Sequence, residues 1–464
     1  MTIPPPSAEL PINLPYAFAL GAAAACGGLM FGFDIAIIAG AGPFLVDRFA
    51  LSPLQMGLAF SILLFGCALG ALGAGPLSDR FGRRRVMLAV AVIFAVTSVW
   101  TGLAPDYDSL LLARFVGGLG VGAVSVAAPT YVSEISPPSI RGRMGALYQL
   151  SIVIGIFASY LINYALKDIG PDAWRWMFAS GAAPSVAFFL LVLWAAETPA
   201  YLVKRGREEE ARRVLERLGG ERADAALMRI RASVAGAGPG LKVLLEPRLR
   251  KPLLITIVLA VLVHASGINT VIDYAPLILR SAGFTLDAAL FSTLVLGGAN
   301  LLFTLVSFWT IDRFGRKPLY LVGSLGMAAA LAGMMIAVAT GQFQGVLVLS
   351  LIVAYLFFFA SCIGPVFWTL TPELFPNTAR GVAMSVPVLT QWIANAVVVL
   401  VFPSAFAEIG RIGTFALLAS ACVLQAVFVQ LFAPETRNRS LEEIEGLWSA
   451  DEAPARGRDA ILQE

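Results

Sequence analysis

The sequence predicts an all-α membrane protein with twelve transmembrane helices in two six-helix bundles. The chain is 58% hydrophobic and only 14% charged, whereas a soluble domain is about one-quarter charged. Residues 318–372 contain no charged side chain at all. A bilayer span needs about 20 apolar residues, so this run alone is long enough for two spans. Three short motifs also recur in the second half of the chain, which indicates a duplication.

Twelve apolar runs follow one another along the chain. They are too long and too continuously apolar for barrel strands, so we expect helices that satisfy their own backbone hydrogen bonds. The N-terminus lacks a basic region followed by a small-residue cleavage site, so the first run is predicted to be a retained span. The predicted spans are residues 15–40, 57–77, 86–104, 108–131, 144–166, 176–196, 252–280, 288–311, 318–340, 346–371, 381–405 and 412–433.

Basic residues are distributed very unevenly between the loops. Of the 33 Lys and Arg residues, 27 fall in alternate loops and the tails, five fall in the other loops, and Arg114 lies inside a span. Basic loops stay in the cytoplasm, so both termini are predicted to be cytoplasmic. The net charge of +3 reflects this asymmetry and does not indicate nucleic-acid binding. The cysteines, which do not suggest a disulfide framework because all lie in spans, are Cys26, Cys67, Cys362 and Cys422.

Three motifs are repeated in the same order with offsets of 233 to 239 residues. Such regularity is hard to obtain by chance and is typical of parallel repeats in transporters, which place a solute site between two halves. The pairs are DRFGR at 79–83 and 312–316, Glu134…Arg141-Gly142 and Glu373…Arg380-Gly381, and Glu197-Thr198 and Glu435-Thr436.

The segment between the halves is polar and helical in pattern. REEEARRVLERLGG and ERADAALMRIRASV are predicted to form short amphipathic helices that brace the cytoplasmic face, and LEEIEGLWSA in the tail could add another. The predicted divisions are an N-terminal bundle at 1–196, a cytoplasmic linker at 197–251, a C-terminal bundle at 252–433 and a cytoplasmic tail at 434–464.

Asp34 and Arg114 are charged residues inside apolar spans. Asp34 lies about twenty residues into the first span, near its outer third, and Arg114 lies at a similar depth because the fourth span runs inward from about Ser109. A lone carboxylate there costs roughly 3 kcal/mol, so the two are expected to pair. A proton on Asp34 would free Arg114, so the pair could couple transport to protons. The alternative is a static buried salt bridge.

The glycine run GGLGVG at 117–122 does not have nucleotide-loop spacing, and no P-loop motif occurs in the sequence. Glycines inside a span allow helices to pack closely. We therefore expect no direct use of ATP. A transporter makes no covalent change to its solute, so we also expect no enzymatic activity, no catalytic residue, no metal site and no cofactor.

Eight longer motifs are spread over the chain from the first span to about Glu445. They are GPLSDRFGRRR (75–85), ARFVGGLGVG (113–122), PTYVSEISPPSIRG (129–142), ETPAYLVKRGR (197–207), GIN…YAP (267–276), IDRFGRK (311–317), GPVFWTLTPELFPNTARG (364–381) and PETRNRSLEEIE (434–445). Together they resemble the sugar porter family of the major facilitator superfamily, which includes bacterial proton-coupled sugar symporters and facilitative glucose transporters. The resemblance implies the major facilitator fold and alternating access. It also implies proton coupling, because proton-coupled members have an aspartate at the place of Asp34.

Charged residues of both signs cluster at the predicted cytoplasmic helix ends. Paired across those ends, they would hold the outward-open state and separate when the inner face opens. Topology signals and helix capping are the alternative, but positive-inside placement alone would need no carboxylates. The gating candidates are Asp79, Arg83, Arg84, Glu134, Arg141, Glu197, Asp312, Arg316, Glu373, Arg380 and Glu435.

The resemblance also implies a set of sugar ligands within the spans. Amides can bind pairs of sugar hydroxyls, and an aromatic face can stack on the ring. Hydrogen bonding between helices is the alternative for each amide. The candidates are Gln149, Asn269, Asn300, Trp368, Gln391 and Trp392.

The seventh span contains HASGINTVIDYAP, with the only histidine of the chain. Ser266, Gly267 and Pro276 are typical of a broken helix, which usually lines a cavity. Polar side chains in such a segment are therefore candidates for contact with the solute.

Two residues of this segment depart from the family pattern. The family usually has glutamine at the position of His264 and tyrosine at that of Asp273. His264 can titrate near neutral pH. Asp273 could bind hydroxyls, bind a cation or act as a second proton site. The alternatives are a hydrogen bond from His264 to a neighbouring helix and a wetted Asp273 near the outer mouth. These departures, with Ile156 where glutamine is frequent, put the usual hexose specificity in doubt.

We expect a monomeric proton symporter of a bacterial inner membrane that imports a monosaccharide or related polyol. Its partners would be the sugar, protons and the bilayer, without nucleic acid. A passive facilitator of the same fold is the nearest alternative. A solute sensor is less favoured because only about thirty residues follow the last span. Export of an amphipathic cation attracted by Asp273 is a further alternative.

Overall fold

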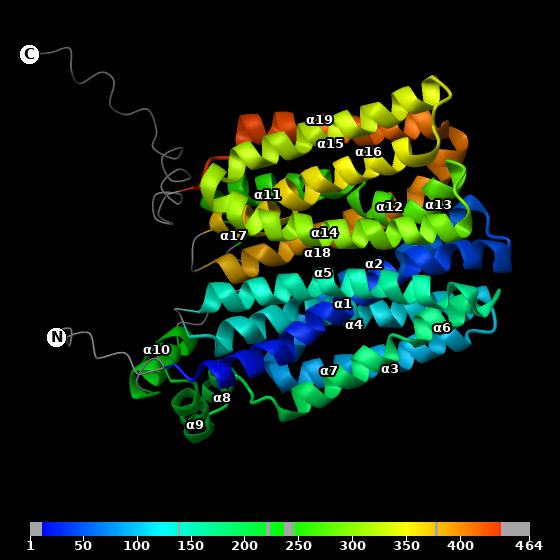
Figure 1. The fold of residues 1–464 in the computed structure, drawn as a ribbon. Coiled ribbons are helices and arrows are strands. Elements are labelled where there is room, and N and C mark those ends of the chain that lie inside the picture. Colours follow the sequence, from blue (N-terminus) through cyan, green and yellow to red (C-terminus); the bar gives the residue numbers. More distant parts are fainter. Residues whose placement is uncertain are drawn as a thin grey trace, which may run out of the picture.

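The computed structural model is mostly helical over the residues that it describes, with no strand among them. Twelve helical segments are long and apolar enough to cross a membrane, which confirms the number of spans predicted from the sequence. The N-terminal half, α1 to α7, and the C-terminal half, α11 to α19, lie beside each other along a common direction (Figure 1). The structure describes residues 12–137, 140–219, 223–235, 244, 246–375 and 379–437.

The N-terminal half contains six of the spans, the last of them built from two helices. A short turn at Ser180-Gly181 separates these two helices. The helices are α1 (Leu14–Phe49), α2 (Pro53–Phe81), α3 (Arg83–Leu103), α4 (Tyr107–Ile135), α5 (Arg141–Leu166), α6 (Ala173–Ala179) and α7 (Ala182–Trp194).

The first helix extends well beyond the predicted end at residue 40. It continues through Pro43 to Phe49, where Ala50 adopts a left-handed conformation. Most residues from Ile37 to Leu45 are buried, so packing against neighbouring helices extends α1 past the point where the hydropathy falls. Asp34 consequently lies near the middle of α1, and its predicted position in the outer third is wrong.

The C-terminal half contains two interrupted spans. The seventh is broken at Ser266-Gly267, as the sequence predicted, and again at Tyr274. The tenth contains a π-helical turn, η3, which is often found at functional sites. The helices are α11 (Pro247–Ala265), α12 (Ile268–Asp273), α13 (Ala275–Ser281), α14 (Leu286–Phe314), α15 (Arg316–Ala339), α16 (Gly345–Phe358), η3 (Phe359–Ile363), α17 (Gly364–Glu373), α18 (Arg380–Glu408) and α19 (Gly410–Phe432).

Glycines bring the helices of the N-terminal half into backbone contact. A Cβ at Gly118 would lie 2.1 Å from the Leu63 carbonyl oxygen, and one at Gly122 would lie 2.0 Å from that of Cys67. These contacts join α4 to α2 and confirm that the GGLGVG run serves close helix packing.

Three short helices form the linker: α8 (Pro199–Lys204), α9 (Glu208–Leu218) and α10 (Ala223–Ala235). The last two match the predicted amphipathic helices, whereas α8 was not predicted. All three gather beyond the spans at one end of the molecule, called here the linker end (Figure 1). The predicted tail helix lies outside the described residues.

Ring contacts and ion pairs join the two halves toward the end opposite the linker. Phe60 stacks on Tyr274 with ring centroids 4.3 Å apart, and Tyr164 packs against Phe291 at 5.6 Å. At the same end, Lys167 Nζ lies 3.0 Å from Asp287 Oδ1. The two halves are therefore closed against each other at this end.

Candidate functional site

The structure brings Asp34 and Arg114 together. Arg114 Nη1 donates to Asp34 Oδ1 at 2.9 Å and to the Asp34 carbonyl oxygen at 3.1 Å. Arg114 is 2% exposed, so its charge is almost completely removed from solvent. The pairing expected from their similar depths is present, and a role in proton coupling stays a prediction.

An aromatic ring and a glycine lie beside this pair. The Arg114 guanidinium lies 5.2 Å from the centre of the Phe178 ring, a cation–π distance. A Cβ at Gly117 would lie 3.5 Å from Asp34 Oδ2 and 3.2 Å from Thr97 Oγ1. Glycine at this position thus leaves room beside the carboxylate.

His264 and Gln391 form a second polar group, in the C-terminal half. The His264 side chain on α11 is hydrogen-bonded to the Gln391 side chain on α18. His264 Nδ1 and Trp392 Nε1 are buried and have no hydrogen-bond partner among the described residues. The Trp392 ring lies 5.7 Å from Phe31 of α1, so these residues also contact the N-terminal half.

The remaining predicted sugar ligands are dispersed over several helices. Gln149 on α5 and Asn269 on α12 are both partly buried. Asn300 on α14 lines a small, mainly apolar cavity with Tyr160 and Ile272. Trp368 on α17 is 45% exposed and packs against the buried Phe367. Their role in sugar binding stays a prediction.

Asp273 is buried, with 4% of its surface exposed. The expectation that it might be wetted near the outer mouth is therefore wrong, since it ends α12 inside the contact between the halves. It interacts electrostatically with Arg114 and with Tyr160, whose hydroxyl has no hydrogen-bond partner in the part of the chain that the structure describes. A second carboxyl group, from the other half, thus lies within electrostatic range of Arg114.

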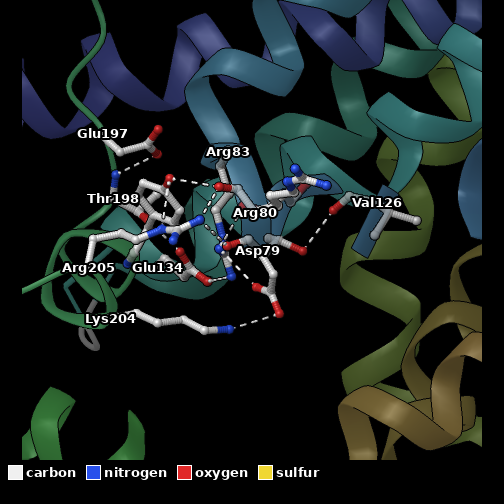
Figure 2. A network of polar contacts seen from close by, with 12 residues as sticks. Asp79, Arg80, Arg83, Val126, Glu134, Glu197, Thr198, Lys204 and Arg205 are labelled. Atoms are coloured by element: carbon white, nitrogen blue, oxygen red, sulfur yellow. Dashed lines mark hydrogen bonds and ion pairs between the residues drawn. The ribbon is translucent and has the colours of Figure 1, made fainter. Parts of the chain in front are cut away.

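A charge cluster closes the linker end of the N-terminal half (Figure 2). Arg83 Nη2 on α3 lies 2.9 Å from Glu134 Oε1 on α4. The Thr198 hydroxyl donates to Glu134 Oε2 at 2.5 Å, and Glu197 accepts from the Arg84 backbone N–H at 3.3 Å. These contacts connect α3, α4 and the chain that follows α7.

Asp79 extends this cluster to the linker. Its carboxylate lies 3.1 Å from Arg83 Nη1 and 3.0 Å from Lys204 Nζ of α8 (Figure 2). Because α8 is held in this way, the linker helices are fixed to the N-terminal half.

The C-terminal half has the same arrangement of ion pairs and hydrogen bonds. Arg316 Nη2 lies 3.0 Å from Glu373 Oε1, and the Thr436 hydroxyl donates to Glu373 Oε2 at 2.6 Å. Glu435 accepts from the backbone N–H groups of Arg316 at 3.1 Å and Lys317 at 3.0 Å. The repeated motifs found in the sequence therefore occupy equivalent places in the two halves.

Each cluster supplies a distant cap to a helix that lacks its own. Gly82 and Gly315 precede α3 and α15 with φ of 98° and 89°, and neither helix has a local side-chain cap. Glu197 and Glu435 instead bind the free N–H groups, where the helix dipole favours a negative charge. A Cβ at Gly82 would lie 2.2 Å from Glu197, which explains the glycine in both DRFGR motifs.

Burial raises the pKa of Glu435, but backbone N–H groups of Arg437, Arg316 and Lys317 stabilise its charged form. The net result is a pKa below the ordinary glutamate value. Glu435 is therefore ionised in its capping role at neutral pH.

Three gating candidates have side chains outside the described part of the structure. They are Arg141, Asp312 and Arg380. Among the gating candidates whose side chains are described, each ion pair lies within one half. No pair in this group links the two halves directly.

Comparisons with known proteins place the chain in a family. Residues 20–448 match the family described as sugar (and other) transporter. The arabinose-proton symporter of Bacillus subtilis is 37% identical over 448 residues, covering 94% of this chain and 96% of that protein. The chain belongs to the sugar transporter family. It is accordingly an integral membrane protein with the major facilitator fold.

Solved structures of a sugar transporter agree with this assignment. The xylose transporter XylE from E. coli in a partially occluded inward-open conformation gives a TM-score of 0.82 at 32% identity, covering 92% of this chain and 100% of that chain. XylE bound to 6-bromo-6-deoxy-D-glucose gives 0.78 at 32% identity, covering 94% and 100%.

Several buried polar residues of this sugar transporter were not predicted from the sequence. Tyr160 lies at the contact between the halves, and Asn395, one helical turn after Gln391, is 2% exposed. Asn163 donates to the Ile37 carbonyl oxygen at 3.2 Å and so ties α5 to α1. An amide in an apolar span was a usable signal for both asparagines, whereas nothing in the sequence distinguished Tyr160 from other tyrosines.

Proposed function

We propose that this chain imports a monosaccharide or related polyol by proton symport and alternating access. The observation that carries the proposal is the Asp34–Arg114 pair, in which Arg114 is buried and Asp34 is partly buried. The relatives support it, since they include an arabinose-proton symporter and a D-xylose-proton symporter.

In this pair, a proton and the Arg114 guanidinium compete for the Asp34 carboxylate. A proton on Asp34 removes its charge and weakens its hold on Arg114, which is too deeply buried to pair with water instead. Asp273, from the other half, is then the carboxylate that Arg114 can approach. Protonation would thereby change how strongly the two halves attract each other.

The sugar would bind nearby, between the halves. His264, Gln391 and Trp392 offer a donor, an amide and an aromatic face on two helices. Gln149, Asn269, Asn300 and Trp368 complete the proposed set, and the break at Gly267 gives α12 freedom to adjust. Because His264 stands where the family usually has glutamine, the site would favour a smaller or differently substituted sugar.

The linker end is proposed to face the cytoplasm of a bacterial inner membrane. The contacts at Phe60–Tyr274 and Lys167–Asp287 would then close the outer side. The charge clusters would act in gating by fixing the inner shape of each half, so that the halves rock as units. We propose that the protein works as a monomer, because each half completes its own cluster.

Reconstituted vesicles test this function. With a pH gradient that drives protons inward, labelled arabinose, xylose or glucose should accumulate above the external concentration, and a protonophore should abolish this. Asp34→Asn should stop accumulation and leave exchange intact. Accumulation by Asp34→Asn would rule out coupling through Asp34, equilibration alone in the wild type would indicate a passive facilitator, and no uptake of any sugar would favour a sensor.

A further inference from the structure

A second cavity lies at the linker end, away from the proposed sugar site. Its volume is about 430 Å³, within the usual range for a small-molecule site. It lies between the ends of α2, α3 and α7 and the linker helices α8 and α9. The residues that matter here are four arginines, two glutamates and an apolar rim: Arg84, Arg85, Arg207, Arg213, Glu197, Glu210, Phe81, Leu193 and Trp194.

The cavity has an excess of positive charge. Glu197 is occupied by the N–H group of Arg84, and Glu210 binds Arg207 through bonds of 2.7 and 2.6 Å. Arg85 and Arg213 form no hydrogen bond or salt bridge within the described residues. Both are exposed, so two guanidinium groups are available to an anion.

The apolar rim is also open. Trp194 is 88% exposed, and Leu193 and Phe81 are 44% and 43% exposed. Arg84 fixes this rim, because its guanidinium donates to the carbonyl oxygens of Val192 at 3.2 Å and Leu193 at 2.6 Å. An exposed tryptophan held in place next to basic residues is typical of the membrane–water interface.

The position of the cavity agrees with a location at the membrane–water interface. The second span ends at Phe81, the third begins at Arg83 and the sixth ends at Trp194, so three span ends meet at its rim. The apolar rim therefore faces acyl chains while the arginines lie at the level of phosphate groups.

We propose that this cavity binds the headgroup of an anionic phospholipid. Arg85 and Arg213 contact the phosphate, and Trp194 and Leu193 pack against the upper acyl chain. A free anion would use the arginines but would leave the apolar rim uncovered. A basic pocket at the cytoplasmic ends of spans is the arrangement that recognises such headgroups.

Native mass spectrometry of the purified full chain in detergent tests the site. Phosphatidylglycerol should bind with higher affinity than phosphatidylcholine of the same chain length, and inorganic phosphate should not displace it. Arg85→Gln with Arg213→Gln should weaken phosphatidylglycerol binding by roughly 25-fold, about fivefold for each arginine. Neither side chain forms a hydrogen bond or salt bridge within the described residues, so folding should be unchanged.

The matched control is Arg143→Gln with Arg250→Gln, two exposed arginines at the same end that lie outside the cavity. This variant should keep wild-type affinity. Equal weakening by both double variants, equal affinity for phosphatidylcholine, or displacement by inorganic phosphate would each overturn the proposal. As an independent readout, brominated phosphatidylglycerol should quench the wild-type tryptophan fluorescence more than that of Trp194→Phe.

Discussion

Arg114 and Asp34 are joined twice, because one guanidinium nitrogen donates to both the carboxylate at 2.9 Å and the backbone carbonyl at 3.1 Å of the same residue. The second contact does not depend on the charge of Asp34. Protonation therefore weakens the link without removing it, and Arg114 remains near α1 while its charge becomes available to another acceptor. Such a graded change suits a reversible coupling step better than a bond that is made or lost completely.

Asp34→Asn should separate coupling from translocation. The amide keeps the size of the carboxylate and its carbonyl can still accept from Arg114, but it cannot bind a proton. Accumulation driven by a pH gradient should fall at least tenfold, whereas counterflow exchange should stay within about threefold of wild type. Both are measured with labelled sugar in vesicles. Equal loss of exchange would indicate a structural role for Asp34 instead.

Gly118→Ala should destabilise the N-terminal half. Its Cβ would lie 2.1 Å from the Leu63 carbonyl oxygen, so α2 and α4 must separate. Overpacking of this kind costs about 1–3 kcal/mol, visible as a lower melting temperature in detergent. Gly145→Ala is the control, since a Cβ there meets no atom within 4 Å and the helix gains propensity. A melting temperature unchanged by Gly118→Ala would contradict the close packing.

Glu435→Gln should lower stability in a pH-dependent way. The folded pKa of Glu435 is held below its ordinary value, so its contribution is fully present above that ordinary value, about 4.3, and is lost as the pH falls through the folded pKa. At pH 7 the variant should be less stable by about 1 kcal/mol, as expected for charged hydrogen bonds at a partly exposed site. Thermal melting should show the difference shrinking below about pH 4. A difference that stayed constant would mean that the charge is irrelevant.

His264→Ala and Gln391→Ala should each raise the KM for the transported sugar about tenfold, because each removes a polar contact from the proposed site. The measurement is initial uptake against sugar concentration. Gln425→Leu is the control: Gln425 is a buried amide on α19 that has no hydrogen-bond partner within the described ranges, so its removal should leave KM unchanged. If the two alanine variants lower only the melting temperature, the His264–Gln391 bond is structural.

Asp273→Tyr restores the residue that sugar porters commonly have at this position. If Asp273 contributes to solute choice, the ratio of kcat/KM values for a pentose and a hexose should change at least tenfold, about 1.4 kcal/mol. Competition uptake of two labelled sugars measures this ratio directly. An unchanged ratio would remove Asp273 from the proposed solute site.

Hydropathy and the repeated motifs were sufficient to predict the spans, because a bilayer imposes both length and apolar character. Helix ends were harder to predict from the sequence. Burial extends α1 to Phe49, and the salt bridge between Lys204 and Asp79 holds α8. The similar depth of Asp34 and Arg114 predicted their pairing even though the estimated depth was wrong. Tyr160 was not predicted because its position depends on the contact between the two halves. No local sequence pattern predicts that contact.

Capping of α3 by Glu197, and of α15 by Glu435, has a consequence for biosynthesis. The residue that completes the third helix of each half is made only after the sixth span of that half has been synthesised. A nascent chain released before residue 197 would thus lack the final bond of its first bundle, whereas one that includes α8 would have all of them. The first half could therefore reach its finished form in the membrane while the second is still on the ribosome.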